Sequence, residues 1–552
     1  MSTYTDASLI YYPSGYKASK AYSLKPTDGS GDLTFTRASS ATRVNADGLI
    51  EKVRTNLILQ SETFDNAYWS KPSGSSVTAN SVANPIDGAI TADTLTVVTT
   101  QYSGLYGAGT GSGNFTQSIY AKKNTIDFLY IFNPEGTIIA AWFNLANGTL
   151  GQVTVGYSAN IESVGNGWYR CSIRNTSTQA NNYFQIGLSS TDGSNTPSAA
   201  GSAYIFGAQS ELSALATKYI PTTTTAVSVG MLANVPRIDY TGGGCAKLLL
   251  EPQRTNIALR SEEFSNASSW ALTNSGTITA NTTISPDGTQ TADTLNAGAN
   301  SAQVQQAPTG TSGAVYTVSI WVKRITGTGN VFLRAVENAD TLIAVTSDWQ
   351  RFTATVTSTS TLIRVGVKLA TSGDAVAIWG AQLELGSYPT SYIPTTTTAV
   401  TRVADGASKS GISSLINSEE GVVFIDMAAF QDTATTREII IGSSPNDYIR
   451  FGYVNFGSAI QFRYYSGGAL IFNKFYTSTI TNFNKIAFGW QANNFVVYEN
   501  GVKKLEQLSG ATSAAAFNSI DTSTLTFQGK IQSFMIFKTR LDNATLAALT
   551  TL

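Results

Sequence analysis

The side chains best suited to ligand chemistry in this sequence are aromatic rings that stand beside small polar residues. A sugar ring stacks on a flat apolar face while its hydroxyl groups bond to polar atoms, so tyrosine, tryptophan and asparagine together are typical of sugar recognition. Tyr464 and Tyr465 point to opposite faces of the strand that we expect here, so one of them should face solvent. Trp142 lies in an apolar stretch, where it could serve either the core or a ligand. The candidate ligand-binding residues are Tyr465, Tyr464, Asn446, Asp447, Tyr448 and Trp142.

Calcium is the metal that these candidates could hold, because its ligands in proteins are oxygen atoms on loops. Asn446 and Asp447, in the segment SSPND, are the first choice for such a site. The pattern D-x-D-x-D-G, which would mark a calcium loop, does not occur in the chain. No cofactor is expected, and the metal content stays open.

The acidic residues do not point to a catalytic pair. A glycosidase needs two carboxyl groups held roughly 5–10 Å apart, and no spacing among the 36 acidic residues singles out two of them. Several acids recur in a duplicated pattern, where a structural role is the better interpretation. Aspartates in Asp-Gly turns accept hydrogen bonds from their own turn, and Glu211 and Glu384, which follow the GAQ strand, bond locally. These recurring acids are Asp87, Asp287, Glu211, Glu384, Glu62 and Glu262.

Composition excludes several functional classes. The chain has 552 residues and no histidine, which excludes Ser-His-Asp and Cys-His catalysis and histidine metal sites. Cys171 and Cys245 are the only cysteines, so a disulfide framework cannot form. We expect Cys171 to be a buried thiol and Cys245, which follows three glycines, to lie in a linker without a bridge to it.

The charge balance argues against nucleic acid and membrane as partners. Lysine and arginine number 35 and the acidic residues 36, for a net charge of −1, and no basic cluster is present. A nucleic-acid-binding role would leave a basic footprint. No segment approaches the roughly 20 apolar residues that span a bilayer, so we expect no membrane insertion.

A long internal repeat organises the chain. The offset between equivalent residues falls from 200 at Arg54 and Arg254 to 173 at Tyr219 and Tyr392, so the first copy is the longer. Its extra residues fall between the SIYAKK and GAQ segments. The matching pairs include RTNLILQSE with RTNIALRSE, TADTL with TADTL, QSIYAKK with VSIWVKR, YIFGAQSEL with AIWGAQLEL, and YIPTTTTAV with YIPTTTTAV. Tryptophans that recur in this pattern are expected in the core, as is Trp490.

Alternating polar and apolar residues between Gly, Asn, Asp and Ser turns favour short strands, and we expect an all-β chain of antiparallel β-sandwich domains. Arg54 and Arg254 are expected to pair with Glu51 and Glu251. Near the C-terminus, Asn500-Gly501 predicts a hairpin turn, and Asp542 or Asn543 should cap a short helix. The expected units are an extended or lightly structured N-terminal attachment region at 1–53, a first repeat at 54–228, a linker at 229–253, a second repeat at 254–402 and a C-terminal domain at 403–552.

These motifs resemble known families. The doubled set of NLILQSETF, TADTL, SIYAKK and GAQ segments is similar to jelly-roll carbohydrate-binding modules. The segments KIAFGWQANNFVVYENG and GKIQSFMIFKTRLDNATLAAL are similar to concanavalin-like or laminin-G-like lectin domains. Together they resemble phage head-fibre or tail-fibre proteins. The resemblance implies beads of jelly-roll sandwiches with a C-terminal lectin-like sandwich, and a homotrimer on the virion.

We therefore expect a non-enzymatic phage fibre or spike protein that adheres to host-surface or mucus glycans. Its N-terminus would attach to a capsid or tail protein, with ligand binding on loops 443–448 and 465–470 of the C-terminal domain, the part farthest from the particle. The first residues lack the pattern of a signal peptide, so we expect synthesis in the bacterial cytoplasm, release by lysis and display on the virion surface. The alternatives are a purely structural head-decoration fibre and a tailspike that depolymerises polysaccharide. Head attachment is not distinguished from tail attachment.

Overall fold

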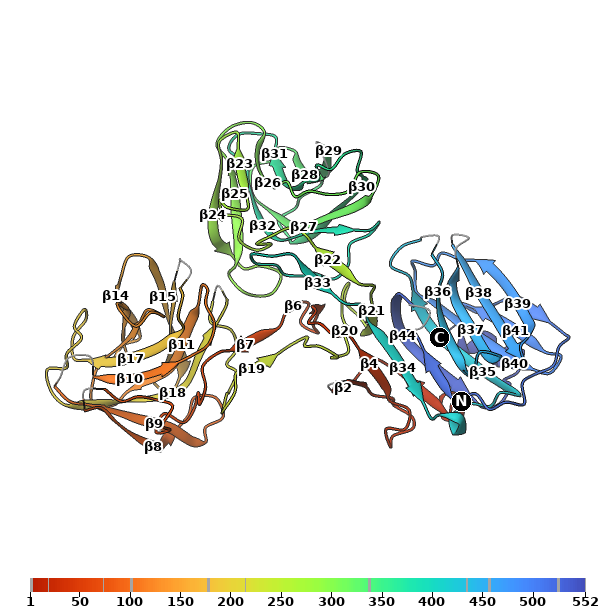
Figure 1. The fold of residues 1–552 in the computed structure, drawn as a ribbon, viewed down its shortest axis with the longest axis horizontal. Coiled ribbons are helices and arrows are strands. Elements are labelled where there is room, and N and C mark those ends of the chain that lie inside the picture. Colours follow the sequence, from red (N-terminus) through yellow and green to blue (C-terminus); the bar gives the residue numbers. More distant parts are fainter. Residues whose placement is uncertain are drawn as a thin grey trace.

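The computed structural model describes residues 3–17, 19–72, 74–99, 103–175, 179–213, 215–335, 339–432, 435–454, 458–523 and 527–551. Its regular structure is almost entirely antiparallel β-sheet, arranged in three lobes (Figure 1). The helical elements of the described residues are short: α1 (Thr3–Asp6), α2 (Asn543–Leu549) and the 3-10 turn η1 (Ser413–Leu415). None of the described helices is long and apolar enough to cross a membrane. The prediction of an all-β chain of antiparallel sandwiches is confirmed.

The first repeat forms the lobe at the left of Figure 1, where two sheets enclose one apolar core. The five-stranded sheet has the order β10 (Gly104–Ala108), β17 (Tyr183–Ser189), β12 (Phe128–Phe132), β13 (Ile139–Asn144) and β14 (Thr149–Val153). The six-stranded sheet has the order β15 (Tyr157–Gly165), β16 (Trp168–Asn175), β11 (Thr116–Lys123), β18 (Gly201–Glu211), β9 (Ile90–Val97) and β8 (Ser76–Ala83).

The second repeat forms the upper lobe, again with two sheets around one core (Figure 1). One sheet has the order β23 (Ala271–Thr273), β26 (Ala302–Gln306), β31 (Val365–Leu369), β28 (Val331–Ala335) and β29 (Ala339–Ile343). The other has the order β24 (Gly276–Thr283), β25 (Ala292–Ala297), β32 (Ala375–Leu385), β27 (Val315–Thr326) and β30 (Gln350–Thr357).

The two repeats share one topology, as their shared motifs predict. β8-β9-β18-β11-β16 of the first repeat corresponds in order to β24-β25-β32-β27-β30 of the second. The extra residues of the first copy supply β14 and β15, which lie between the SIYAKK and GAQ strands as expected. Trp69 and Trp270 are both 2% exposed, and their indole N–H groups donate to the backbone oxygens of Gln60 and Arg260 at 2.9 and 3.0 Å. Trp168 and Trp379 are buried as well, whereas Trp321 and Trp349 are half-buried, so the expectation of a core position holds for four of the six recurring tryptophans.

Short strand pairs close each repeat and connect it to the rest of the chain. Their members are β7 (Arg54–Asn56) with β19 (Val227–Val229), β22 (Arg254–Asn256) with β33 (Val400–Arg402), and the hairpin β5 (Arg43–Val44) with β6 (Ile50–Glu51).

The third lobe, at the right of Figure 1, combines the C-terminal region with strands from the N-terminus and the linker, and we call it the composite sandwich. Its nine-stranded sheet has the order β2 (Tyr16–Lys17), β3 (Lys20–Ala21), β4 (Leu33–Thr36), β34 (Gly406–Ser410), β43 (Ser519–Asp521), β36 (Arg437–Ser444), β37 (Asp447–Val454), β38 (Ala459–Ser466) and β39 (Ala469–Thr477). Its eight-stranded sheet has the order β20 (Ile238–Asp239), β21 (Lys247–Leu250), β44 (Gly529–Phe537), β35 (Glu420–Ala428), β40 (Asn484–Gln491), β41 (Phe495–Glu499) and β42 (Val502–Gln507), with β1 (Leu9–Tyr11) also paired to β44.

This arrangement corrects the structural part of two sequence predictions. Residues 1–53 are not an extended or lightly structured segment, because β1 pairs with β44 and β4 pairs with β34. Residues 229–253 are more than a linker, because β21 pairs with β44. The physical reason is burial: Leu9, Leu33 and Phe35 enter the core of the composite sandwich and are at most 7% exposed.

A buried ionic cluster, which we call the hub, joins the segments that connect the lobes. Arg37 and Arg237 both contact the carboxylate of Asp405, Arg37 at 3.2 Å. Arg237 and Arg402 contact Glu251 at 2.6 and 2.8 Å. Burial alone would raise the pKa of Glu251, but the charges of Arg402 and Arg237 lower it below its ordinary value.

The hub also corrects the expected ion pairs. Glu251 pairs with Arg237 and Arg402 rather than with Arg254, whose guanidinium lies over the ring of Tyr388 at 5.3 Å. Glu51 pairs with Arg43 at 2.8 Å, across the β5–β6 hairpin, rather than with Arg54. Glu251 thus pairs with arginines that the fold brings close, and Glu51 pairs with its cross-strand neighbour. Neither pairs with the arginine nearest in sequence.

Several local signals behave as predicted. Asn500 and Gly501 have positive φ angles of 48° and 82°, which the predicted hairpin turn requires. The Asp542 carboxylate accepts the backbone N–H of Thr545 at 2.7 Å and caps α2. Cys171 is a buried free thiol, and Cys245 is a free, exposed one. Trp490 is fully buried in the core of the composite sandwich.

Candidate functional site

Two of the candidate tyrosines meet on the outer face of the nine-stranded sheet. Tyr448 in β37 and Tyr465 in β38 are register partners, and their rings stack with centroids 4.5 Å apart and an interplanar angle of 23°. Both side chains are half-buried. Burial and the neighbouring Tyr465 raise the pKa of Tyr448, so its hydroxyl stays protonated near neutral pH. Whether the pair binds a ligand stays a prediction.

Tyr464 does not belong to this pair. It points into the core, is fully buried, donates its hydroxyl hydrogen to the backbone oxygen of Ser418 and accepts the N–H of Ser513 at 2.9 Å. The alternation expected for Tyr464 and Tyr465 is therefore confirmed, with Tyr465 as the outward member. As a ligand-binding residue, Tyr464 is excluded by its burial.

Trp142 is also a structural residue rather than a ligand platform. It is 8% exposed and packs with Tyr130, Phe132 and Ile139 on β12 and β13. Its indole N–H donates to the backbone oxygen of Ser194 at 2.7 Å. The polar tip of the ring is therefore satisfied within the protein.

Asn446 and Asp447 lie at the end of the sheet beside the tyrosine pair. The Asp447 carboxylate accepts the N–H of Gly467 at 2.8 Å and the hydroxyl of Ser513 at 2.6 Å, and these hydrogen bonds lower its pKa. The backbone oxygen of Asn446 accepts the N–H of Gly468 at 2.9 Å, and the Asn446 side chain is exposed. Asp447 thus joins the two loops that border the pair.

The hydrogen bonds from Gly467 and Ser513 both end on the Oδ1 atom of Asp447, and its Oδ2 atom accepts the hydroxyl of Ser444 at 3.4 Å. Within the part of the chain that the structure describes, no group of three or more metal-ligating acids or cysteines gathers anywhere.

Sequence reasoning missed the polar residues that surround the tyrosines. On the same strands, Ile449, Phe451, Ile460 and Phe462 point into the core, so the residues between them point outward. We call this surface the tyrosine–arginine face and define it by its outward side chains Tyr448, Arg450, Gln461, Arg463, Tyr465 and Asn473. Period-two alternation from Tyr465 through Arg463 to Gln461 could have revealed it.

The arginines of this face share one carboxylate. Glu438 in β36 is buried and forms an ion pair with Arg463, and the Nε atom of Arg450 lies 3.7 Å from its other oxygen. Gln461 donates to the side-chain oxygen of Asn473 at 2.6 Å. Guanidinium and amide groups are thus held in place beside the aromatic pair, a combination that can bond to hydroxyl and carboxylate oxygens.

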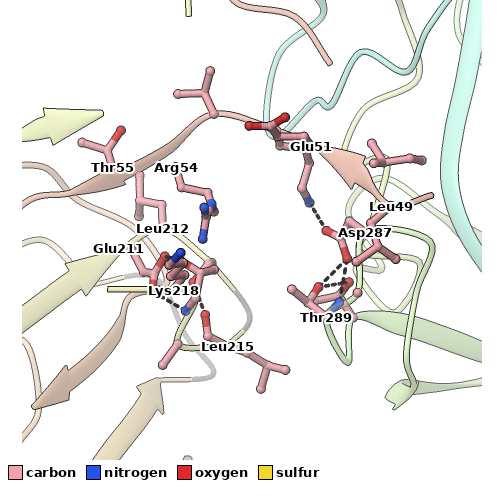
Figure 2. A pocket seen from close by; sticks show the side chains of 18 of the residues that line it. Leu49, Glu51, Arg54, Thr55, Glu211, Leu212, Leu215, Lys218, Asp287 and Thr289 are labelled. Carbon is pink, nitrogen blue, oxygen red and sulfur yellow. Dashed lines mark hydrogen bonds and ion pairs between the residues drawn. The ribbon is translucent and has the colours of Figure 1, made fainter. Parts of the chain in front are cut away.

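A cavity of about 680 Å³ lies between the first and second repeats (Figure 2). It is lined by residues 49–55, by 211–213 and 215–218 of the first repeat, and by 287–289 of the second. In Figure 2, Arg54, Glu211 and Lys218 lie on one side and Asp287 and Thr289 on the other.

Lys52 lies in the segment between the β5–β6 hairpin and the first repeat, and it connects this segment to the second repeat at the cavity. Its Nζ atom lies 2.8 Å from Glu262 and 2.7 Å from Asp287. Burial lowers the pKa of Lys52, but the two carboxylates more than offset this and hold it above its ordinary value. Asp287 also accepts the N–H of Thr289 at 3.0 Å, so the prediction that it caps its own turn is confirmed. The ion pairs of Lys52 thus hold the segment 49–55 against the second repeat.

Asp87, Glu211 and Glu384 bond locally, as the sequence predicts, whereas Glu262 bonds to the distant Lys52 and Tyr392. Asp87 accepts the N–H of Ala89 at 2.9 Å. Glu211 accepts the N–H of Thr217 at 2.7 Å, and Glu384 accepts the N–H of Thr390 at 2.9 Å, the same contact in the two repeats.

No family model matches the chain, and no curated protein compared with it matches. Among solved structures, domain 4 of AbnA, a GH43 extracellular arabinanase from Geobacillus stearothermophilus in complex with arabinotriose, is 19% identical, covering 27% of this chain and 73% of that one with a TM-score of 0.23. The Bacillus licheniformis β-glucanase is 13% identical, covering 25% and 72% with a TM-score of 0.20.

A structure of botulinum neurotoxin type C, whose cell entry depends upon interaction with two ganglioside molecules, is 12% identical. The match covers 27% of this chain and 39% of that one, with a TM-score of 0.23. This chain therefore spans less than half of the toxin chain. At these identities and scores, the likenesses carry no functional information about this chain.

Proposed function

We propose that the chain is a non-enzymatic adhesion protein of a phage fibre or spike, displayed on the virion surface, that binds glycans of the host surface or of mucus. The observation that supports this is the tyrosine–arginine face. The stacked rings of Tyr448 and Tyr465 stand beside held guanidinium and amide groups on the outside of a sheet. Flat apolar faces with adjacent polar donors are what sugar recognition needs.

The environment of the carboxylates at this face favours binding of a glycan without its hydrolysis. A glycosidase needs two carboxyl groups flanking the scissile bond. Here Glu438 is buried and paired with Arg463, and Asp447 accepts hydrogen bonds from Gly467 and Ser513. Neither group is placed as a free acid beside the tyrosines.

The positional argument for the ligand site does not hold. The sequence suggested that an N-terminal anchor leaves the C-terminal domain farthest from the particle. Both chain ends lie in the composite sandwich (Figure 1), because β1 pairs with β44. The site assignment therefore rests on the chemistry of the tyrosine–arginine face, and attachment through the N-terminus to a capsid or tail protein stays a prediction.

A glycan array probed with the full-length chain tests the proposal, together with a search for released oligosaccharide. Saturable binding without product supports adhesion. Absence of binding to any glycan would favour the structural decoration fibre, and released oligosaccharide would favour a depolymerase.

A further inference from the structure

The tyrosine–arginine face carries more positive than negative charge. Arg450 and Arg463 share the single carboxylate of Glu438, which leaves one positive charge uncompensated. The arginine side chains are 24% and 18% exposed, whereas Glu438 is 1% exposed and lies beneath them. The excess charge therefore sits at the surface, in a chain whose net charge is −1.

Two further acids near this face accept hydrogen bonds from other groups. Asp521 in β43 is the register partner of Ile440, which is in turn the partner of Arg450. Asp521 is therefore two strands from Arg450, a backbone separation of roughly 10 Å, and its carboxylate accepts the N–H and the hydroxyl of Ser523. Asp447, at the end of the sheet, is engaged by Gly467 and Ser513.

The guanidinium groups also keep donors for an external acceptor. Each guanidinium has five N–H donors. Arg463 donates one terminal N–H to Glu438, and the Nε atoms of both arginines are buried, so the donors that could reach an external acceptor are the other N–H groups of the terminal nitrogens. Planar guanidinium groups bind carboxylate and sulfate oxygens in a forked geometry.

The spacing places an anion beside a stacked ring. Tyr465 and Arg463, like Tyr448 and Arg450, are two residues apart on one face of a strand, a separation of roughly 7 Å. The guanidinium of Arg450 lies over the ring of Tyr448 at 5.5 Å, so a sugar that contacts the tyrosine pair would carry its substituents next to the arginines. We propose that the glycan bound by the tyrosine–arginine face is anionic and carries a carboxylate or a sulfate that the two arginines bind. This inference rests on the proposed function of the same face.

The test compares matched sugars on one array, using the full-length chain. The probes are 3′-sialyllactose with lactose, tri-galacturonate with its carboxyl-reduced form, and a sulfated galactose trimer with its unsulfated parent. We expect the anionic member of at least one pair to bind about tenfold or more tightly than its neutral partner. The responding pair identifies the anion as carboxylate or sulfate. The preference should weaken between 50 and 500 mM salt, because exposed charges are screened.

Variants locate the preference on this face. Arg450→Gln removes the uncompensated charge while keeping the Arg463–Glu438 pair, so we expect it to abolish the preference: the anionic and neutral members of a pair should then bind equally well. Arg450→Lys keeps the charge and should retain the preference. The matched control is Arg364→Gln in the second repeat, which removes a half-buried arginine that donates to Gln305 at 3.1 Å. It should change nothing.

The outcomes separate this inference from the proposed function. Equal binding of neutral and anionic members by the wild-type chain would overturn the inference and leave glycan binding standing. An anionic preference that survives Arg450→Gln would also overturn it, because the anion would then bind elsewhere. Absence of binding to every sugar on the array would overturn both.

Discussion

Replacing Asp405 by asparagine is expected to destabilise the composite sandwich by about 3–5 kcal/mol. The hub contains three guanidinium groups and two carboxylates, whose side chains are 0–3% exposed. Asp405 contacts both Arg37 and Arg237, so neutralising it raises the buried net charge from one to two positive charges. Removing one partner of a buried ion pair is costly because it leaves the remaining charge without compensation or water.

The control for this variant is Glu506→Gln, which breaks the 2.9 Å pair between Lys503 and Glu506. Those side chains are 43% and 34% exposed, so we expect a cost below about 1 kcal/mol. Urea unfolding gives the free energies, and hydrogen exchange of β35 and β44 peptides reports on the composite sandwich itself. A shift for Asp405→Asn no larger than that for Glu506→Gln would refute the view that the hub holds this lobe together.

Three further outcomes are expected. Burial raises the pKa of Asp426 to about 6, so the folded protein binds a proton at Asp426 more tightly than the unfolded chain, and the contribution of Asp426 to stability falls as pH rises from about 4 to 6. In urea titrations, Asp426→Asn should therefore gain about 2–3 kcal/mol of stability at pH 7 and little at pH 4. An equal gain at both pH values would contradict this. Fragments 54–229 and 254–402 should each be soluble with the circular dichroism of β-sheet, because each has its own core and closing strand pair, and aggregation of both would count against independent domains. Light scattering at micromolar concentration should give the mass of a trimer, and a monomer mass would exclude the proposed homotrimer.

The repeated units could be predicted because their information is local. Motifs such as TADTL recur together with their structural contacts. Asp93 and Asp293, in the two TADTL segments, are both buried. Asp93 accepts the backbone N–H of Asn80, and Asp293 that of Asn281, each at 2.9 Å. Period-two alternation likewise assigned Tyr464 and Tyr465 to opposite faces.

The composite sandwich could not be predicted in the same way, because its strands near the N-terminus are two to four residues long and pair with strands hundreds of residues away. Such short segments carry too little periodicity to be distinguished from loops. The ion pairs of the hub could not be predicted for a related reason. Which arginine contacts Glu251 depends on how three distant segments of the chain meet.

Part of the candidate site could be predicted from the sequence, and part of it could not. Tyr448 and Tyr465 were found from their residue type and strand alternation. Arg450 and Arg463 were missed because their importance depends on sharing Glu438 across three strands, and this requires the register of β36, β37 and β38. Trp142 was retained as a candidate because nothing local shows that the carbonyl of Ser194 covers its indole N–H.

The most direct test of the central claim is the glycan-array binding of the full-length chain with Tyr465→Ala. Losing a centrally placed aromatic side chain at a binding site costs about 2 kcal/mol or more, so we expect binding to fall at least tenfold. Tyr465→Phe, which keeps the stacked ring, should retain most of the binding, and Tyr22→Ala, which removes a 38% exposed tyrosine elsewhere in the same lobe, should retain all of it. The account predicts this order of affinities, and undiminished binding by a folded Tyr465→Ala protein would contradict it.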